Sequence, residues 1–532
     1  MRDAIQMNTI DVAFVLMSLA LATALAARRI SVPAPVLFAA VGIVGGAVWH
    51  LVPALPPVRM PPDLVLFAFL PPLLMTAAYA LPLQAFGRNL LPIVLLAVGL
   101  VLATMGVAAI VGHALVGLPW AAAFALGTII APPDPVAATS VASKTGLPHR
   151  LVVILEGEGL VNDAVAIVAY GIAVDALVSG HFAWGEVFWS LLRETPTGIL
   201  FGLLIGGGAA LVRRYVDSVP LEVGISLVTP YLAYHLADQF GFSGVLAVVT
   251  LGFMLRWSSF CVSSPVARLA ARTVWSFVRY ASTALVFLLL GLLIGEIAVD
   301  WPSRAVVIAG IILSGALVAV RIVWMLLVPR LFAALGVSQA AKSSTAEQVV
   351  LGWAGMRGVV SLALALALPL SLGGSEQTRN TIVFLTLVVI IVTLIVQGAT
   401  LMPLVQWLKA GDPEREKREE RHARLKALRA GVAVIRGANG TTKGLDEATR
   451  QNLIREVGEG TRGIAEAGVG GTSHHCNRIL LQALDAQRDV VNCLRDAGQL
   501  GGELAERLDT ELDLDAMSAR GEGKRLTNSG DE

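Results

Sequence analysis

Six ionisable residues lie inside long apolar stretches of this 532-residue chain, where water does not solvate them well. A charged side chain at the centre of a bilayer costs about 2.5–3.5 kcal/mol on insertion scales, so each one needs a partner or a function. Such groups either pair with one another and hold a helix bundle together, or bind a proton or a cation. The six residues are Asp134, Glu156, Glu158, Asp163, Arg321 and Arg357.

Asp163 and Asp134 are the two carboxylates expected near the middle of the membrane. Asp163 follows Arg150, and Asp134 precedes Lys144, by roughly half the length of a spanning helix at about 1.5 Å per residue. Their two stretches run in opposite directions and therefore bring the acids to similar depth. Asp163 has the neutral Asn162 beside it, and we interpret Asp163 as the carboxylate that binds the substrate.

The segment GTIIAPPDPVAAT around Asp134 predicts a broken helix. Pro132, Pro133 and Pro135 cannot remain in one continuous helix, because proline lacks the amide hydrogen and clashes with the preceding turn. Broken backbone at bilayer depth is tolerated only where protein or a water-filled cavity surrounds it, and its freed groups can hold ions. We expect Pro133 and Pro135 to support the break, and Asp134 to lie beside helix N-termini.

A second interruption is expected in VVLGWAGMRGVVSLALALALP, where Gly352, Gly355 and Gly358 surround Arg357. Glycines also permit close helix packing, so by themselves they are a weak signal of a break. The prediction is strengthened because this stretch and the Pro-broken stretch would occupy matched positions in two repeats. If helices 1–6 and 8–13 are inverted repeats, the fifth and twelfth helices correspond and cross in opposite directions, as in secondary transporters. Arg357 is then expected beside carbonyl ends, with an architectural role rather than direct ion contact.

The sixth stretch contains EGEGLVNDAVAIV, in which Glu158 and Asn162 share a helix face. Glu158 and Arg321 lie at similar distances from the inner ends of their helices, so we predict that they form a buried ion pair with a structural role. Glu156 precedes Asp163 by two turns on the same face and is expected to line an inner funnel.

Composition identifies the class of protein that must position these groups. The chain is 55% hydrophobic and only 15% charged, which is too apolar for ordinary soluble domains and fits an all-α polytopic membrane protein. Thirteen apolar stretches have about the length needed to cross a bilayer. They cover residues 9–27, 33–52, 63–80, 91–113, 118–143, 150–178, 187–212, 219–237, 241–257, 276–299, 303–329, 346–370 and 380–407.

Basic residues in alternate loops predict the orientation, since they favour the cytoplasmic side. The richer loops and the charged tail place the N-terminus outside and the C-terminus in the cytoplasm. These loops contain Arg28, Arg29, Arg88, Lys144, Arg150, Arg213, Arg214, Arg256, Arg268, Arg272, Arg279, Arg330 and Lys342. The first stretch has only Arg2 before it and a basic pair after it, so we interpret it as a retained helix rather than a signal peptide.

Two domains are expected, a transmembrane domain at residues 1–408 and a cytoplasmic tail at residues 409–532. The tail is predicted to be helical at 412–429, irregular in the Gly-rich stretch 431–471, and helical again at 476–514. Cys261, Cys476 and Cys493 lie in or next to predicted cytoplasmic segments, so free thiols rather than disulfides are expected. We read His474–His475–Cys476 as a turn before a helix rather than a metal site, because no second ligand group has matching spacing.

The formal net charge of +1 provides no basic surplus for binding nucleic acid. The apolar composition instead makes the lipid bilayer the expected surrounding of the chain. We expect no cofactor.

Five motifs, in order, resemble the monovalent cation:proton antiporter-1 family, the sodium/hydrogen exchangers, and its bacterial branch in particular. They are PPDPVAA, EGEGLVNDA, FLLLGLL, the arginine in GALVAVRIVW, and WAGMRGVVSLALALALP. The resemblance covers residues 9–407, and the tail sequence ELDLD is also similar to that branch. It implies a thirteen-helix, usually homodimeric antiporter in the bacterial inner membrane.

The resemblance also implies roles for single residues. Asp163 would bind either the cation or the proton, and Asn162 would orient the site. Asp134 would lie at the helix break, and Glu158 with Arg321 would form a structural bridge.

The chain departs from the family pattern at three positions. Pro133 stands where the family often has Thr, Gly159 where Ser often follows the first bridge acid, and Thr76 where many relatives carry an acid. Two hydroxyl ligands are therefore missing, and backbone carbonyls or water must supply the oxygens.

A proton and a cation can each neutralise one aspartate, so they compete for it. We predict that Asp163, as the ligand of the transported metal ion, exchanges one external H⁺ for one cytoplasmic Na⁺ in pH and sodium homeostasis. Exchange would be electroneutral because Asn162 adds no second carrier charge. Li⁺ and K⁺ are further candidate substrates, and hard oxygen donors suit all of these ions.

Three alternatives differ from this prediction. A K⁺/H⁺ antiporter would use the same residues, and a sodium-coupled symporter would move an organic solute. An intramembrane hydrolase would use Asp134 and Asp163 as a carboxylate pair. The Pro-broken helix and the paired repeat favour ion passage over an enzyme.

Overall fold

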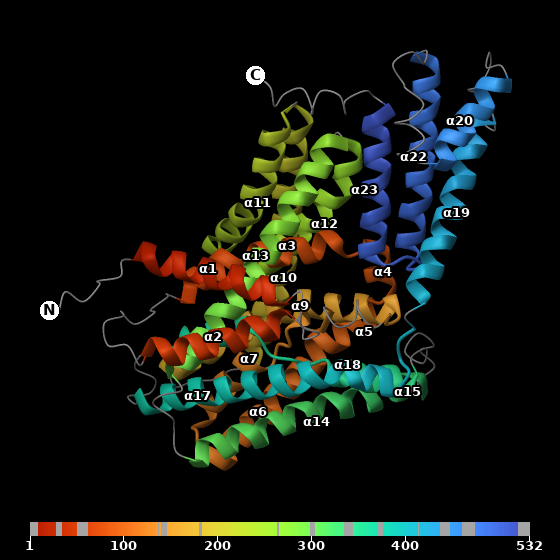
Figure 1. Cartoon of the computed structure of the whole chain (residues 1–532). Helices are drawn as coiled ribbons and strands as arrows, with labels where there is room; N and C mark the ends of the chain where they lie inside the picture. The colour runs from red at the N-terminus through yellow and green to blue at the C-terminus, as the bar shows by residue number, and fades with distance from the viewer. Residues whose placement is uncertain are drawn as a thin grey trace.

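The computed structural model is helical throughout its regular elements, and no strand occurs in the part of the chain that it describes (Figure 1). The apolar runs form long helices because a helix satisfies every backbone polar group within its own segment. The described residues are 9–27, 34–50, 62–136, 138–139, 146–179, 184–216, 218–262, 265–297, 304–334, 344–369, 376–412, 414–436, 447–459 and 474–519.

The apolar part of the chain forms a bundle of helices, two of which are interrupted by short irregular segments. In chain order its elements are α1 (Thr9–Ala27), α2 (Ala34–His50), α3 (Pro62–Ala80), α4 (Leu83–Arg88), α5 (Leu90–Val94), η1 (Leu95–Leu100), α6 (Val101–Val116), α7 (Trp120–Ile130), α9 (His149–Ser179), α10 (Trp184–Arg214), α11 (Val219–Gln239), α12 (Gly244–Val262), α13 (Pro265–Ile297), α14 (Arg304–Ala334), α15 (Thr345–Trp353), α16 (Val359–Leu366), α17 (Glu376–Val392), η4 (Thr393–Gln397) and α18 (Gly398–Trp407).

Five stretches of described helix are long and apolar enough to cross a membrane by length and composition. They are Leu90–Val116, Arg193–Arg214, Pro265–Leu292, Arg304–Phe332 and Gln377–Trp407, and shorter apolar helices accompany them. Many large apolar side chains lie on the outside of the bundle, including Phe14, Leu204 and Leu327, each more than 60% exposed. An exterior of this kind matches hydrocarbon rather than water.

The helix α13 begins at Pro265, well before the start at residue 276 that apolarity alone predicts. Its first turns carry Arg268 and Arg272, whose side chains form ion pairs with acids near the end of the chain. Apolarity marks only the part of a helix that hydrocarbon surrounds, so the extension was not apparent from the sequence.

The helices α2 and α13 approach closely because glycines face each other at their crossing. A Cβ added at Gly42 would lie 2.9 Å from the Gly291 Cα, and one added at Gly291 would overlap the Ala39 carbonyl. Small residues of this kind allow backbones to approach within a membrane bundle. The crossing lies next to the part of α13, residues 276–287, that lines the cavity described below.

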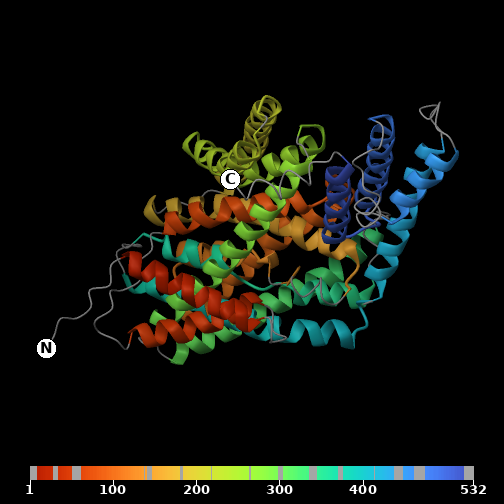
Figure 2. The same cartoon turned by 45° about the horizontal axis from the view of Figure 1, so that its top comes forward.

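Four tail helices stand together at one side of the molecule, drawn in blue (Figures 1 and 2). They are α19 (Arg415–Ile435), α20 (Glu447–Glu459), α22 (His474–Asp496) and α23 (Gly502–Ala519). Their apolar faces form a separate core that includes Leu453, Ile479, Leu484, Leu500 and Leu508.

Part of the tail prediction was wrong. The stretch 431–471 was expected to be irregular, yet α19 continues to Ile435 and α20 lies within the stretch, because both helices bury apolar residues in the tail core. The segment expected to be one helix at 476–514 is divided at Gly498, whose φ of 69° gives the left-handed backbone that ends α22. His474–His475–Cys476 was expected to be a turn before a helix, but its backbone forms the first turn of α22. The side chains of these three residues lie outside the described residues. Cys493 is a free, exposed thiol.

Replacing Gly291→Ala should weaken the α2–α13 crossing. The added methyl group must displace the backbone of α2, and overpacking of this kind costs about 1–3 kcal/mol of unfolding free energy. We expect a lower thermal unfolding midpoint of the detergent-solubilised protein. Gly315→Ala in α14 is the matched control, because a Cβ there meets nothing within 4 Å. An equal shift in both variants would contradict the close crossing.

Candidate functional site

Two interrupted helical elements meet in the middle of the bundle. One break follows α7, where Pro132, Pro133 and Pro135 surround Asp134, and the other separates α15 from α16 at residues 354–358. The backbone amide of Asp134 donates a 2.6 Å hydrogen bond to the Met356 carbonyl oxygen. A Cβ added at Gly358 would overlap the Asp134 carboxylate, so only glycine permits this approach.

The Asp134 carboxylate lies at the start of the helical turn that follows the break. Its Oδ1 accepts a 2.9 Å hydrogen bond from the Val136 amide. Acids at this position satisfy free amides and favour the positive end of the helix dipole. Asp134 therefore stabilises the broken segment while also facing the cavity.

Arg357 lies within the second break and is 2% exposed. Its Nε donates to the Ile130 carbonyl oxygen at 2.5 Å, and its Nη1 donates to the Gly355 carbonyl oxygen at 2.5 Å. Both acceptors are carbonyls at or just beyond helix C-termini, which lack the usual partner one turn further on. Arg357 thus satisfies the carbonyl groups at two helix C-termini, and it does not line the cavity.

The long helix α9 carries Asn162 and Asp163 past the first break. The Asn162 Nδ2 lies 3.3 Å from the Pro133 carbonyl oxygen and donates to it, so Asn162 links α9 to the broken segment. Pro135 packs against the same helix, because a Cβ added at Gly159 would overlap its ring. Asp163, which is 8% exposed, instead lines the cavity.

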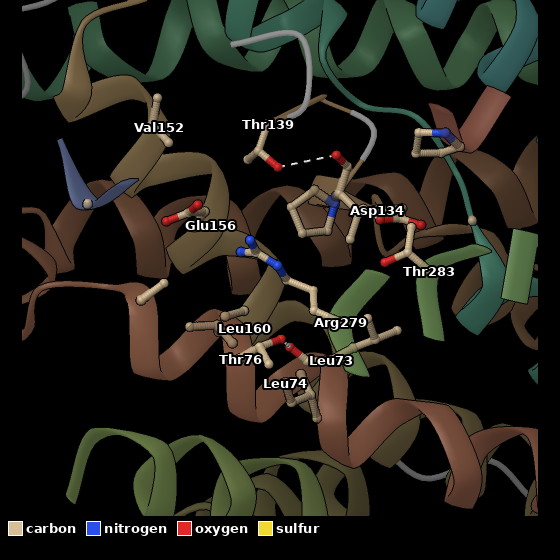
Figure 3. Close-up of a pocket in the computed structure, with 18 of the residues that line it drawn as sticks. Leu73, Leu74, Thr76, Asp134, Thr139, Val152, Glu156, Leu160, Arg279 and Thr283 are labelled. Carbon is tan, nitrogen blue, oxygen red and sulfur yellow. Dashed lines mark hydrogen bonds between the residues drawn. The ribbon is translucent and has the colours of Figure 1, made fainter. Parts of the chain in front are cut away.

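A cavity of about 630 Å³ contains both acids predicted to lie at mid-depth. Figure 3 shows Asp134 among the residues that line it. Asp134 and Asp163 line it, together with Glu156, Thr76 and Arg279. The Thr76 hydroxyl donates to the Leu73 carbonyl oxygen at 3.0 Å, which leaves its oxygen lone pairs as acceptors. The cavity therefore combines carboxylate and hydroxyl oxygens, the donor set that hard cations such as alkali ions prefer.

Ser361 is a cavity residue that sequence reasoning missed. It lies in the first turn of α16, is 1% exposed, and its Oγ has no hydrogen-bond partner among the described residues. Buried hydroxyls normally have such a partner, so an unpaired one in a cavity is a candidate ligand. The only sequence signal was a serine one turn after Arg357 in an otherwise apolar run.

Glu158 and Arg321 form a bidentate ion pair between α9 and α14. The Nη1–Oε1 and Nη2–Oε2 distances are 2.5 and 2.7 Å, and both residues are almost fully buried. Arg321 Nε also donates to the Leu351 carbonyl oxygen at 3.1 Å, which joins the pair to α15. Neither residue lines the cavity, so the pair connects three elements around it.

Comparison with known proteins places this architecture in a family. The family model described as "Sodium/hydrogen exchanger, transmembrane" matches residues 15–407, so the chain belongs to the sodium/hydrogen exchanger family. It is therefore a multi-pass membrane transporter of a family that exchanges Na⁺ and H⁺.

Several relatives agree with this assignment. An uncharacterised Na⁺/H⁺ exchanger of Mycobacterium tuberculosis is 30% identical over 92% of each chain. The Na⁺/H⁺ antiporter ApNhaP of Aphanothece halophytica is 32% identical over 71% of each chain. A sodium, potassium, lithium and rubidium/H⁺ antiporter of Bacillus pumilus is 29% identical over 79% of this chain and 64% of its own.

The sodium proton antiporter MjNhaP1 of Methanocaldococcus jannaschii has a similar fold. Its structure superposes with a TM-score of 0.58 at 20% identity, covering 76% of this chain and 100% of that one. The bundle therefore has the architecture of a known antiporter.

Replacing Glu158→Gln should destabilise the protein strongly. The change leaves the Arg321 guanidinium buried without its anionic partner, and breaking a buried pair in this way costs about 3–5 kcal/mol. Thermal unfolding of the solubilised protein measures the loss. The double variant Glu158→Gln with Arg321→Gln should recover much of it, because no uncompensated charge remains. A double variant that is less stable than the single one would contradict this account.

Proposed function

We propose that the protein exchanges one cytoplasmic Na⁺ for one external H⁺ at Asp163. The observation that carries the proposal is the position of the Asp163 carboxylate in a cavity at the crossing of two broken helices. A proton and a cation both neutralise a carboxylate, so only one of them occupies it at a time. Alternating access then carries each ligand across in turn.

The neighbours of Asp163 support a single carrier charge. Asn162 is neutral and donates to the Pro133 carbonyl, and the Asp134 carboxylate accepts from the Val136 amide. Asp134 therefore already has a backbone partner, and Asp163 is the group that gains and loses its ligand. One Na⁺ for one H⁺ at one carboxylate is electroneutral.

Other hydroxyl oxygens in the cavity support cation binding, although Pro133 and Gly159 stand where the family often has Thr and Ser. Ser361 and Thr76 line the same cavity from α16 and α3 and supply acceptor oxygens. Carboxylate and hydroxyl oxygens also suit K⁺ and Li⁺, and the Bacillus pumilus relative is described as an antiporter of several alkali ions. A K⁺/H⁺ antiporter using the same residues is therefore the second candidate.

The proposal includes the arrangement of the chain in the membrane. Thirteen spans with two inverted repeats would place the N-terminus outside and the tail, from residue 409, in the cytoplasm of a bacterial cell, with two copies forming a homodimer. The interruptions after α7 and between α15 and α16 support the repeat, because they cross at one site. The cellular role of such an exchanger is pH and sodium homeostasis.

Replacing Asp163→Asn should abolish exchange without preventing insertion, because an amide cannot alternate between a proton and a cation. Everted vesicles from an antiporter-deficient host measure this as loss of a preformed pH gradient on addition of Na⁺, Li⁺ or K⁺. Asp175→Asn is the matched control, since Asp175 is exposed on the same helix α9.

Each result of this assay has a defined meaning. Robust exchange by Asp163→Asn would overturn the assignment of the carboxylate, and a response to K⁺ alone would select the second candidate. An imposed membrane potential should leave the rate unchanged, and a rate that follows the potential would contradict electroneutral exchange.

Replacing Ser361→Ala should raise the Na⁺ concentration for half-maximal exchange about twofold to thirteenfold, the effect of losing one contact of about 0.5–1.5 kcal/mol. The maximal rate should change less. Ser314→Ala is the matched control, because Ser314 is equally buried in α14 but donates to the Gly310 carbonyl. An unchanged half-maximal concentration in Ser361→Ala would exclude Ser361 as a ligand.

A further inference from the structure

The tail contributes residues to the wall of the cavity that contains Asp163. Gly501, Gly502, Leu504 and Glu506, at the start of α23, all line it. The tail thus lines the same cavity as the proposed ion site, although more than 300 residues separate the two in sequence.

The start of α23 lies against the ends of two membrane helices. A Cβ added at Gly501 would be 3.9 Å from His149 Nδ1 at the beginning of α9, and one added at Gly502 would be 3.3 Å from the Ala80 carbonyl at the end of α3. Both helix ends are predicted to face the cytoplasm. The tail therefore covers the cavity at its inner side.

Buried ion pairs hold α23 to α13. Arg268 Nη2 lies 2.5 Å from Asp513 Oδ1, with side-chain exposures of 6% and 0%. Arg272 Nη1 lies 3.4 Å from Asp513 Oδ2 and donates to the Thr510 hydroxyl at 2.9 Å. Two arginines of one membrane helix thus bind one turn of the tail.

Arginines of the tail itself bind the same acids. Arg488 Nη2 lies 2.6 Å from Asp513 Oδ1, and Arg495 Nη1 lies 3.6 Å from Asp509 Oδ2. Burial raises the pKa of the Asp509 carboxyl, against the opposing effect of Arg272 and Arg495. We refer to Arg268, Arg272, Arg488, Arg495, Asp509 and Asp513 as the docking cluster.

The spacing of the charges explains why the docking cluster directs α23 to the cavity. Glu506, Asp509 and Asp513 share one face of α23 at i, i+3 and i+7. Asp513 meets Arg268, and Asp509 lies 3.8 Å from Arg272, so the two helices run in opposite directions.

The two helices reach the cavity when α23 is followed towards its start and α13 towards its end. Glu506 is one turn before Asp509 on α23, and Arg279 is two turns after Arg272 on α13. Both line the cavity, and Figure 3 shows Arg279 among its labelled residues. The ion pairs of the docking cluster therefore position the start of α23 at the cavity wall, near Arg279 of α13.

We propose that α23 is an inner gate, which the docking cluster holds over the cytoplasmic mouth of the cavity and whose release admits the cation to Asp163. The gate deepens the proposed function, on which it rests for the orientation of the chain and the identity of the ion. Asp513 keeps the gate closed, because neutralising this residue leaves the buried arginines around it without their shared anion.

A cysteine in the cavity reports the gate without requiring transport. Thr283→Cys places a thiol on α13 at the cavity wall, in a chain with Cys261→Ser, Cys476→Ser and Cys493→Ser. Everted vesicles expose the cytoplasmic face to a membrane-impermeant, cationic methanethiosulfonate reagent. The measurement is the rate at which the thiol is labelled.

Two variants should release the gate from opposite sides. Asp513→Asn acts on the tail, and Arg268→Gln with Arg272→Gln acts on α13 while leaving the Asp513–Arg488 pair intact. We expect both to label about tenfold faster than the parent, which corresponds to about 1.4 kcal/mol less stabilisation of the closed state. Asp489→Asn is the control, since Asp489 is exposed on α22, and it should label at the parent rate.

The outcomes separate the gate from the transported ion. Equal labelling rates in the parent and in both releasing variants would overturn the gate, even if Na⁺ exchange is found. Faster labelling in both variants, without exchange of any cation, would support the gate and reject the proposed substrate. If Asp513→Asn does not accumulate in the membrane, the paired arginine variant decides the result.

Discussion

The need to satisfy backbone polar groups inside a membrane is the constraint on which this structure depends. Three prolines end α7 at Ile130, and the chain cannot bond its own carbonyls and amides there. The backbone amide of Asp134 donates a hydrogen bond to the Met356 carbonyl oxygen. The Arg357 side chain donates to the carbonyl oxygens of Ile130 and Gly355. The two interruptions therefore stabilise each other, and the cavity forms where they cross.

Charge is divided between groups that hold the structure and groups that face the cavity. Glu158 and Arg321 neutralise each other at 2.5 Å and lie outside the cavity wall, whereas Asp163 lies on it. A second buried charge network, around Asp513, joins the tail to α13. Both networks join elements that are far apart in sequence, and each is costly to disrupt because its charges are removed from water.

Much of the architecture follows from local chemistry. The all-helical class follows from apolar runs that must satisfy their own backbone, and the end of α7 follows from Pro132, Pro133 and Pro135. Local patterns were insufficient where a helix continues beyond the apolar region, as α13 does towards Arg268, or where glycine-rich sequence becomes helical, as in α20. Ion pairs with Asp513 join the extended start of α13 to the tail, and packing in the tail core stabilises α20.

The sequence by itself determined that ionisable groups lie in apolar helices and that one helix must break at Asp134, because burial cost and proline geometry depend only on residue type and neighbours. Only the tertiary structure decided which groups meet. It placed Ser361 in the same cavity as Asp163 and joined Arg268 to Asp513. Contacts of this kind depend on how distant helices cross, and the spacing of residues along one helix does not contain that information.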